Sequence, residues 1–231
     1  LLEAYDAMGL SENTYLIFTS DNGGMPTLPI QVNKGEPYSA GLNSPLLRGK
    51  WDLTEGGIRV PLILRWPAVL PAGQTFETPI TAMDLTATVA AAARATPGPE
   101  NPFDGVDLRP ALTSKAELDS ERPLYFRRRT VSLSKNQNAI RQAAIRMGKW
   151  KYLRTHNNRD NTKHKEALYN LDDDIGEEMD LATSDPDQLH AMSSMLQNWE
   201  SEMGTTAIPF APSPRKKKPN DKPTTPLTLQ R

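Results

Sequence analysis

An aspartate and an asparagine stand side by side at a point where a buried strand would end. The apolar run Tyr15–Phe18 comes first, then Asp21 and Asn22, and Gly23 and Gly24 follow directly. Hard cations such as calcium and magnesium prefer oxygen ligands, and these two side chains supply two of them. The glycines let the backbone turn sharply and approach a ligand closely. The pattern predicts a metal site, and the alternative is an ordinary turn, because Asp-Asn-Gly is favourable turn chemistry.

A second segment, residues 43–61, places a lysine in a glycine-rich loop before a strand. Lys50 is followed by the pair Gly56-Gly57 and by an Arg-Val-Pro entry to an apolar run. An ammonium group can neutralise a bound oxyanion, although an isolated lysine is normally a solvated surface charge. For Glu55 and Arg59 we expect structural roles, with Glu55 holding the loop and Arg59 pairing with a carboxylate.

Together, the two segments resemble the sulfatase family, in which Ser-Asp-Asn-Gly precedes a lysine that is followed by Glu-Gly-Gly-Ile-Arg-Val-Pro. Further segments of the chain resemble later elements of the same family in the same order. They are Asp84–Thr88, Asp104–Leu108, Ala144–Tyr152 and Leu168–Glu177. Each match is weak when taken alone, but their common order makes the resemblance specific.

The resemblance implies a role for three residues of this chain. Asp21 and Asn22 match the metal ligands of the family, with one calcium ion expected, and Lys50 matches the lysine that contacts the sulfate group. The family nucleophile is a formylglycine made from a Cys-x-Pro-x-Arg or Ser-x-Pro-x-Arg motif. This chain has no cysteine and no Ser-x-Pro-x-Arg. We therefore expect the nucleophile upstream of this chain, no catalytic residue within it, and no activity of the 231 residues alone.

Five elements are expected in the first half of the chain. Residues 1–9 have helical spacing and end at a glycine. The segment Thr14–Thr19 has the continuous hydrophobicity typical of a buried parallel strand. A long glycine- and proline-rich excursion covers residues 23–57. Val60–Trp66 is a second apolar strand, and Met83–Ala95 is a helix whose alanines suit close packing on a sheet.

The pattern changes after roughly residue 115 to one typical of antiparallel strands. The alternating segments are Leu124–Phe126, Ala143–Leu153 and Leu168–Leu171, with a polar loop at 155–166. Asp185 and Pro186 then open a helix with a capping residue and a proline in its first turn. Its apolar stripe is expected to pack on the small sheet.

The fold class that the resemblance implies is α/β, the rear part of an alkaline-phosphatase-like α/β sandwich followed by a small α+β domain. We expect residues 1–115 to end the α/β catalytic domain. Residues 116–203 are expected to form an antiparallel-sheet subdomain with a terminal helix. Residues 204–231, rich in Pro and Lys, are predicted to be a flexible tail.

The composition narrows the classes of partner. The formal net charge of −1 gives no reason to expect nucleic acid, and no apolar run reaches the length of a membrane span. The resemblance implies a sulfated small molecule or glycan as substrate, either a sulfated carbohydrate or an aryl sulfate. It also implies a periplasmic or extracellular location.

Two alternatives to a sulfatase stay open from the sequence. One is a phosphodiester or phosphonate ester hydrolase of the same superfamily, which would carry a Thr or Ser nucleophile upstream. The other is a non-catalytic relative that binds sulfated glycans without cleaving them.

Overall fold

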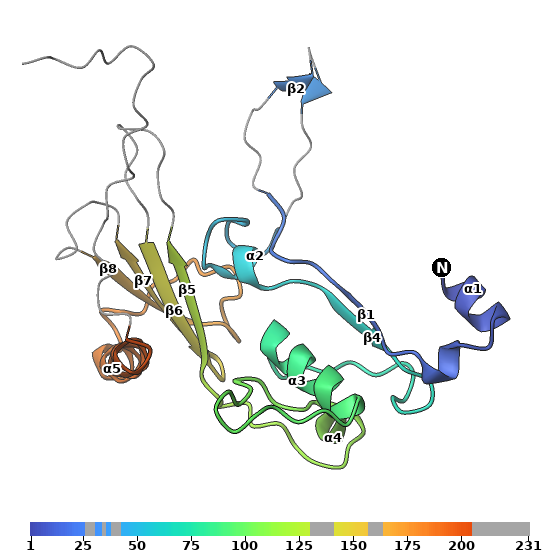
Figure 1. Cartoon of the computed structure of the whole chain (residues 1–231). Helices are drawn as coiled ribbons and strands as arrows, with labels where there is room; N and C mark the ends of the chain where they lie inside the picture. The colour runs from blue at the N-terminus through green and yellow to red at the C-terminus, as the bar shows by residue number, and fades with distance from the viewer. Residues whose placement is uncertain (26–30, 34–35, 38–42, 130–140, 157–163, 205–231) are drawn as a thin grey trace, which may run out of the picture.

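The structure, a computed structural model, describes residues 1–25, 31–33, 36–37, 43–129, 141–156 and 164–204. The described residues form one sheet of four strands and two sheets of two strands each. In Figure 1 the larger sheet lies at one end, and helices α3 and α4 lie beside the strands β1 and β4. The predicted tail lies outside the described residues from residue 205 onward, as does most of the predicted loop at 155–166. None of the helices in the described ranges is long and apolar enough to cross a membrane.

The first group of elements surrounds the two-stranded sheet and agrees with most of the sequence expectations. Its helices and strands, in chain order, are α1 (Leu2–Ala7), the 3-10 helix η1 (Ser11–Asn13), β1 (Leu16–Thr19), β2 (Gln31–Asn33), β3 (Glu36–Pro37), α2 (Glu55–Ile58), β4 (Leu62–Arg65), α3 (Ala82–Ala92) and α4 (Arg109–Leu112). The helix predicted to end at Gly9 is present, and Gly9 has φ +67°, a conformation that favours glycine.

The prediction of a buried, parallel-type strand at Thr14–Thr19 is wrong. β1 pairs antiparallel with β4, and the residues Phe18 and Ile63 are directly opposite each other. Phe18 is 59% exposed and Ile63 is 60% exposed, so one face of this sheet is apolar and open among the described residues. An apolar run alone cannot separate the two arrangements, because an antiparallel sheet can also carry apolar residues on both faces.

Helix α3 is fixed at its start by a capping box and by a buried ion pair. The Asp84 carboxylate accepts a hydrogen bond from the Thr81 backbone N–H at 2.7 Å. The same fully buried carboxylate binds both terminal nitrogens of Arg122, at 2.7 and 2.8 Å. Burial opposes ionisation of Asp84, but the hydrogen bonds from Arg122 and from backbone N–H groups lower its pKa overall. Asp84 therefore joins α3 to the segment that leads into the second sheet.

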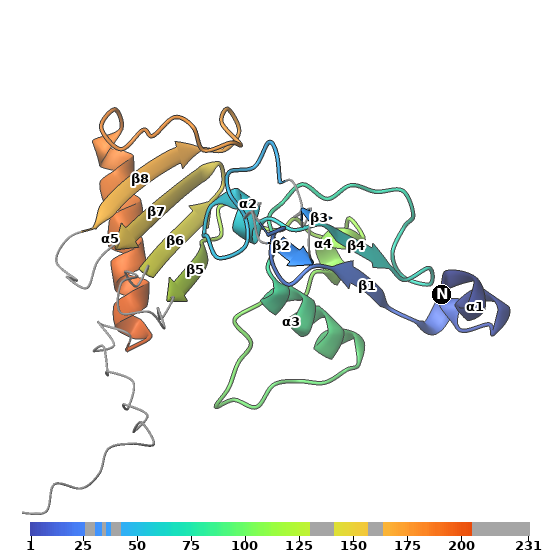
Figure 2. The same ribbon diagram turned by 90° about the horizontal axis from the view of Figure 1, so that it is seen from above.

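The second group is an antiparallel sheet in the order β5-β6-β7-β8, followed by one long helix (Figure 2). The bounds are β5 (Leu124–Arg129), β6 (Arg141–Met147), β7 (Trp150–His156), β8 (Lys165–Asn170) and α5 (Pro186–Glu202). The segment predicted at Ala143–Leu153 is a hairpin, because Gly148 at φ +52° reverses the chain between β6 and β7. The predicted capping of α5 is confirmed, since Asp185 accepts a hydrogen bond from the Gln188 N–H at 3.1 Å.

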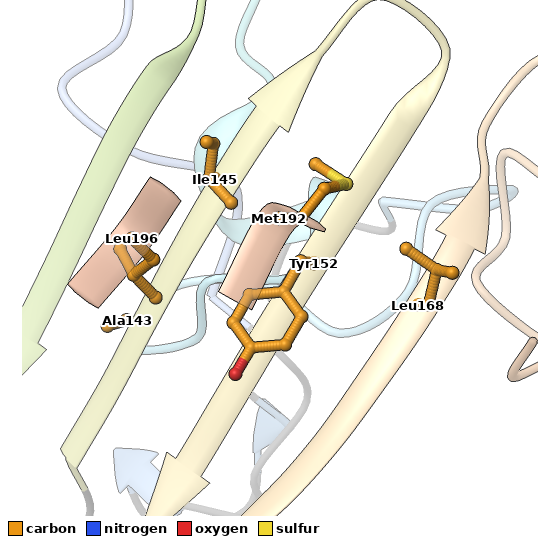
Figure 3. Packing of buried hydrophobic residues seen from close by; sticks show 6 residues of the cluster. All are labelled: Ala143, Ile145, Tyr152, Leu168, Met192 and Leu196. Atoms are coloured by element: carbon orange, nitrogen blue, oxygen red, sulfur yellow. The ribbon is translucent and has the colours of Figure 1, made fainter. Parts of the chain in front are cut away.

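One face of the four-stranded sheet packs against α5 and forms the main core. Alternate strand residues face the helix, as the two-residue period of a strand requires. Ile145 is opposite Tyr152, and Tyr152 is opposite Leu168, so the three side chains make a continuous row across the sheet. Figure 3 shows this row with its neighbours, the strand residue Ala143 and the helix residues Met192 and Leu196.

The opposite face of the same sheet is also covered, by the chain segment around α2. Leu53 packs there against Ala144 and Leu153, which alternate with the residues that face α5. Three polar side chains of this face, Gln142, Arg146 and Lys151, contact the residues 52–55. The loop that carries Lys50 is thus built onto the small sheet as well as onto β1.

Candidate functional site

A cavity of about 870 Å³ lies where the end of β1, the loop before α2 and the small sheet meet. Its wall includes all three residues singled out from the sequence, Asp21, Asn22 and Lys50. Trp51 and Arg59 from the same loop also line it. The volume falls in the range of roughly 300–1,000 Å³ that is usual for small-molecule sites. The structure therefore brings the two sequence segments together around one space.

The Asp21-Asn22 turn is set by local hydrogen bonds after β1 ends. The Ser20 hydroxyl donates to the Asn22 carbonyl oxygen at 2.8 Å. The side-chain amide nitrogen of Asn22 donates to the Gly23 carbonyl oxygen at 3.0 Å. This second bond engages the nitrogen of the amide and leaves its oxygen as the atom that can act as a metal ligand.

Backbone hydrogen bonds join this turn to the loop that carries Lys50. The Lys50 N–H donates to the Gly24 carbonyl oxygen at 3.0 Å, and the Gly23 N–H donates to the Gly57 carbonyl oxygen at 3.0 Å. The Asn43 side chain adds two more bonds, because it accepts from the Gly24 N–H and donates to the Gly24 carbonyl. The backbone therefore fixes the position of Lys50 relative to the Asp21-Asn22 turn.

Gly23 is needed because the backbones of the two motifs are in direct contact, and Gly56 is needed because the second motif packs closely on its own backbone. A Cβ at Gly23 would collide with the carbonyl oxygen of Gly56. A Cβ at Gly56 would collide with the carbonyl oxygens of Leu47 and Arg48. The sequence suggested that Gly23 serves close approach to a ligand; in the structure it permits close approach of the second motif.

The turn at Lys50 is held in an unusual conformation. Arg48 and Trp51 both have positive φ, +58° and +73°. The Arg48 guanidinium binds the Asp52 carboxylate at 2.7 Å, and that carboxylate also accepts from the Thr54 N–H and from the Gln142 side chain, both at 3.1 Å. Burial opposes ionisation of Asp52, but these hydrogen bonds lower its pKa overall.

Glu55 is the centre of a buried ion cluster behind the cavity. The fully buried Glu55 carboxylate accepts from the Lys151 ammonium at 2.9 Å and from the Arg146 guanidinium at 2.9 Å. Lys151 also pairs with Glu177 at 2.9 Å, and Glu177 accepts from the Glu55 N–H at 2.6 Å. Arg59 lies 3.8 Å from Glu55. The expected structural roles of Glu55 and Arg59 are confirmed.

Basic and acidic side chains both line the cavity. The basic ones are Lys50, Arg59, Arg128 and Arg146, and the acidic ones are Asp21, Asp52, Glu55 and Glu77. Arg146 and Lys151 neutralise Glu55, and Arg48 neutralises Asp52. The part of the wall that Lys50 shares with Arg59 and Arg128 is therefore the part that favours an anionic ligand. Arg128 and Arg146 were not identified from the sequence. The available signal was the alternation in β5, which places Leu124, Phe126 and Arg128 on one face.

The oxygen ligands of this chain can be compared with the number and type of ligands that a calcium ion needs. Asp21 and Asn22 offer oxygen ligands of the type that calcium takes, but calcium needs about six to eight. Across the described ranges, no group of three His, Cys, Asp or Glu side chains could hold a metal ion. The donor type fits calcium, and this part of the chain would supply only a share of the ligands.

The histidines lie away from the cavity. The rings of His156 and His164 are 5.2 Å apart between centroids, at the far end of β7 and before β8. Neither belongs to the cavity wall. Burial and the neighbouring Arg154 guanidinium lower the pKa of His156.

The family model and the relatives that this chain matches are all sulfatases. Residues 1–95 match the model of the family described as Sulfatase. The chain is 38% identical over 125 residues to human (Homo sapiens) steryl-sulfatase, covering 54% of this chain and 21% of that protein. It is 35% identical over 128 residues to N-acetylgalactosamine-6-sulfatase of Canis lupus familiaris, covering 55% of this chain and 23% of that protein. This chain spans about a fifth of the length of these relatives.

A solved structure extends the similarity over most of the chain. Ps i-CgsB in complex with k-i-k-neocarrahexaose matches with a TM-score of 0.66 and 33% sequence identity, covering 86% of this chain and 39% of that chain. Because it covers 86% of this chain, the similarity extends well beyond residues 1–95. The predicted fold class, the rear part of an alkaline-phosphatase-like α/β sandwich followed by a small α+β region, is confirmed.

Proposed function

This chain belongs to the sulfatase family, and from that premise we propose that it supplies the calcium- and sulfate-binding side of a site that hydrolyses a sulfate ester. One observation supports this most strongly. Asp21, Asn22 and Lys50, which lie far apart in sequence, line a single cavity and are joined through the Lys50–Gly24 backbone hydrogen bond.

Each residue has a defined part in the proposal. Asp21 and Asn22 would hold a calcium ion through side-chain oxygens, together with ligands from outside this chain. When bound, the ion would supply positive charge that neutralises sulfate oxygens. The Lys50 ammonium would donate hydrogen bonds to a sulfate oxygen and stabilise negative charge as the ester bond breaks. Its fixed backbone keeps that charge in place before the substrate arrives.

We place the nucleophile outside these 231 residues. The chain contains no cysteine and no Ser-x-Pro-x-Arg from which the formylglycine of the family could be made. The chain alone is therefore proposed to bind an oxyanion without turning over an ester. By the same family resemblance, the complete protein is proposed to act in a periplasmic or extracellular setting.

The substrate class that we favour is a sulfated carbohydrate. The cavity of about 870 Å³ is much larger than one sulfate group. Ps i-CgsB, at 33% identity, is described with a bound neocarrahexaose, and another relative is named for its action on N-acetylgalactosamine 6-sulfate. Both point to a sugar as the group that carries the sulfate.

The test uses the complete protein that contains this chain. Sulfate release is measured from a sulfated oligosaccharide and from 4-nitrophenyl sulfate, and phosphodiester hydrolysis is measured in parallel. Lys50→Ala is expected to lower kcat/KM for sulfate esters by roughly 100-fold or more, the usual effect of losing one charge-stabilising donor. Lys149→Ala is the matched control, because Lys149 is an exposed lysine outside the cavity.

Three results would overturn the proposal. The first is full activity of Lys50→Ala. The second is hydrolysis of phosphodiesters with no release of sulfate. The third is saturable binding of sulfated glycans by the complete protein with no turnover, which would indicate a non-catalytic relative.

A further inference from the structure

Trp51 is a large apolar residue in a place where its side chain contributes little to the core. It lies in the cavity wall beside Lys50, and 50% of its surface is exposed. The core contact of this loop is made two residues later by Leu53, which is 7% exposed and packs on Ala144 and Leu153. Packing therefore does not account for a tryptophan at position 51.

The backbone of Trp51 is strained. Its φ of +73° lies in the left-handed region, which is a true outlier for a bulky side chain. Residues held in this way are concentrated at ligand sites, where the surrounding structure enforces the conformation.

Hydrogen bonds on both sides of Trp51 enforce its positive φ. On one side of Trp51, the Lys50 N–H is bound to the Gly24 carbonyl. On the other side, the Asp52 N–H donates to the Gly49 carbonyl at 3.0 Å, and the Asp52 side chain is held by Arg48. Hydrogen bonds on both sides of Trp51 thus fix the turn that places this residue in the cavity wall.

The position of Trp51 relative to the proposed sulfate site adds a second observation. The Lys50 ammonium lies 5.9 Å from the centre of the Trp51 ring. A ligand whose sulfate reaches Lys50 would place its next ring within reach of the indole. Tryptophan gives a large, rigid contact area at a low entropic cost, which suits it to receive the flat apolar face of a ring.

We propose that Trp51 is a stacking platform for the sugar ring of a sulfated oligosaccharide whose sulfate group is held by Lys50. This inference rests on the proposed function. In this proposal Trp51 contacts the sugar, whereas Lys50 and the metal ligands neutralise the charge of the sulfate group. Phe126, which also lines the cavity, extends the apolar part of the wall.

The key variant is Trp51→Gly in the complete protein. Glycine adopts the left-handed conformation without strain, so this change removes the ring and keeps the turn. Trp51→Phe retains an aromatic face, although it also retains the backbone strain. Phe103→Ala is the control, because Phe103 is 41% exposed and lies outside the cavity wall.

Calorimetry measures the Kd of a sulfated hexasaccharide and, separately, of inorganic sulfate. Trp51→Gly is expected to weaken oligosaccharide binding roughly tenfold, with binding of sulfate within about twofold of the wild type. Trp51→Phe should retain most of the affinity, and Phe103→Ala should match the wild type. Lys50→Ala should weaken both ligands.

The outcomes separate this inference from the proposed function. Unchanged oligosaccharide binding in Trp51→Gly, with both ligands weakened in Lys50→Ala, would overturn the platform and leave the proposed function intact. Equal weakening of both ligands in Trp51→Gly would show that Trp51 positions Lys50 and would also overturn it. If Lys50→Ala binds both ligands normally, the proposed function fails together with the inference.

Discussion

The Lys151 ammonium lies 2.9 Å from the Glu55 carboxylate, across 96 residues of sequence, and both side chains are fully buried. Glu55 begins the short helix α2 just after the Lys50 turn, whereas Lys151 belongs to the central strand β7. The small sheet thus supports the loop that carries the proposed sulfate-binding lysine. The buried Glu55 and its partner Arg146 also line the cavity.

Removing Lys151 should therefore destabilise the whole assembly. Lys151→Ala leaves the carboxylates of Glu55 and Glu177 buried with less positive charge nearby, which typically costs about 3–5 kcal/mol. Urea denaturation measures the free energy of unfolding. Lys149→Ala, on the adjacent hairpin turn and exposed, should change it by less than about 0.5 kcal/mol. Equal stability of the two variants would contradict the structural role assigned to the cluster.

The close backbone packing within the segment that carries Lys50 gives a second prediction. Gly56→Ala places a Cβ against the carbonyl oxygens of Leu47 and Arg48, so the Lys50 loop must move away from its position. We expect a loss of about 2 kcal/mol or more of stability and a clear loss of sulfate binding, as is usual for overpacking against backbone.

Gly98→Ala is the matched control for this change. A Cβ at Gly98 meets no atom within 4 Å, and its φ is not in the left-handed region. This variant should keep both its stability and its sulfate affinity. Full sulfate binding by Gly56→Ala would show that the packing of Gly56 on Leu47 and Arg48 does not position Lys50.

His156 predicts a dependence of stability on pH. Burial and the positive charge of Arg154 lower its pKa, with smaller contributions from His164 and Arg141, while Glu200 acts in the opposite direction. Because the folded pKa lies below the unfolded value, the unfolded chain binds the proton first as the pH falls. Stability should then decline as the pH drops from about 7 toward about 5.

The comparison that isolates this effect is His156→Asn against the wild type. The variant should lose less free energy of unfolding between about pH 7 and about pH 5, since all other titrating groups are shared. A direct check is the pKa of His156 by NMR titration. A measured pKa above the usual value of histidine, or an identical pH profile in the variant, would reject the prediction.

The sequence predicted most elements of the fold because their signals are local. The capping residue Asp185 and the alternation in β5 to β8 both follow from the chemistry of neighbouring residues. The direction of β1 was missed, because its apolar run does not show that its partner, β4, runs antiparallel. The turn at Gly148 was also missed, although the residues that pack against α5 change there from Ala143, Ile145 and Met147 to Trp150 and Tyr152.

Part of the cavity wall was predicted for the same reason. Asp21, Asn22 and Lys50 could be identified by residue type and by resemblance to a family. Trp51 and Arg146 could not, because their place in the cavity wall depends on contacts between the loop and a sheet about 100 residues later. A positive φ at Trp51 has no signature in the sequence.

We propose that the oxygens of Asp21 and Asn22 and the ammonium of Lys50 serve one metal and oxyanion site. The most direct measurement is calcium titration of the complete protein by calorimetry, in the wild type and in Asp21→Asn, Lys50→Ala and the exposed control Asp187→Asn. We predict one calcium site that Asp21→Asn weakens by roughly tenfold or more, that Asp187→Asn leaves unchanged, and that Lys50→Ala retains while sulfate affinity is lost. Calcium affinity in Asp21→Asn equal to that of the wild type would contradict the account.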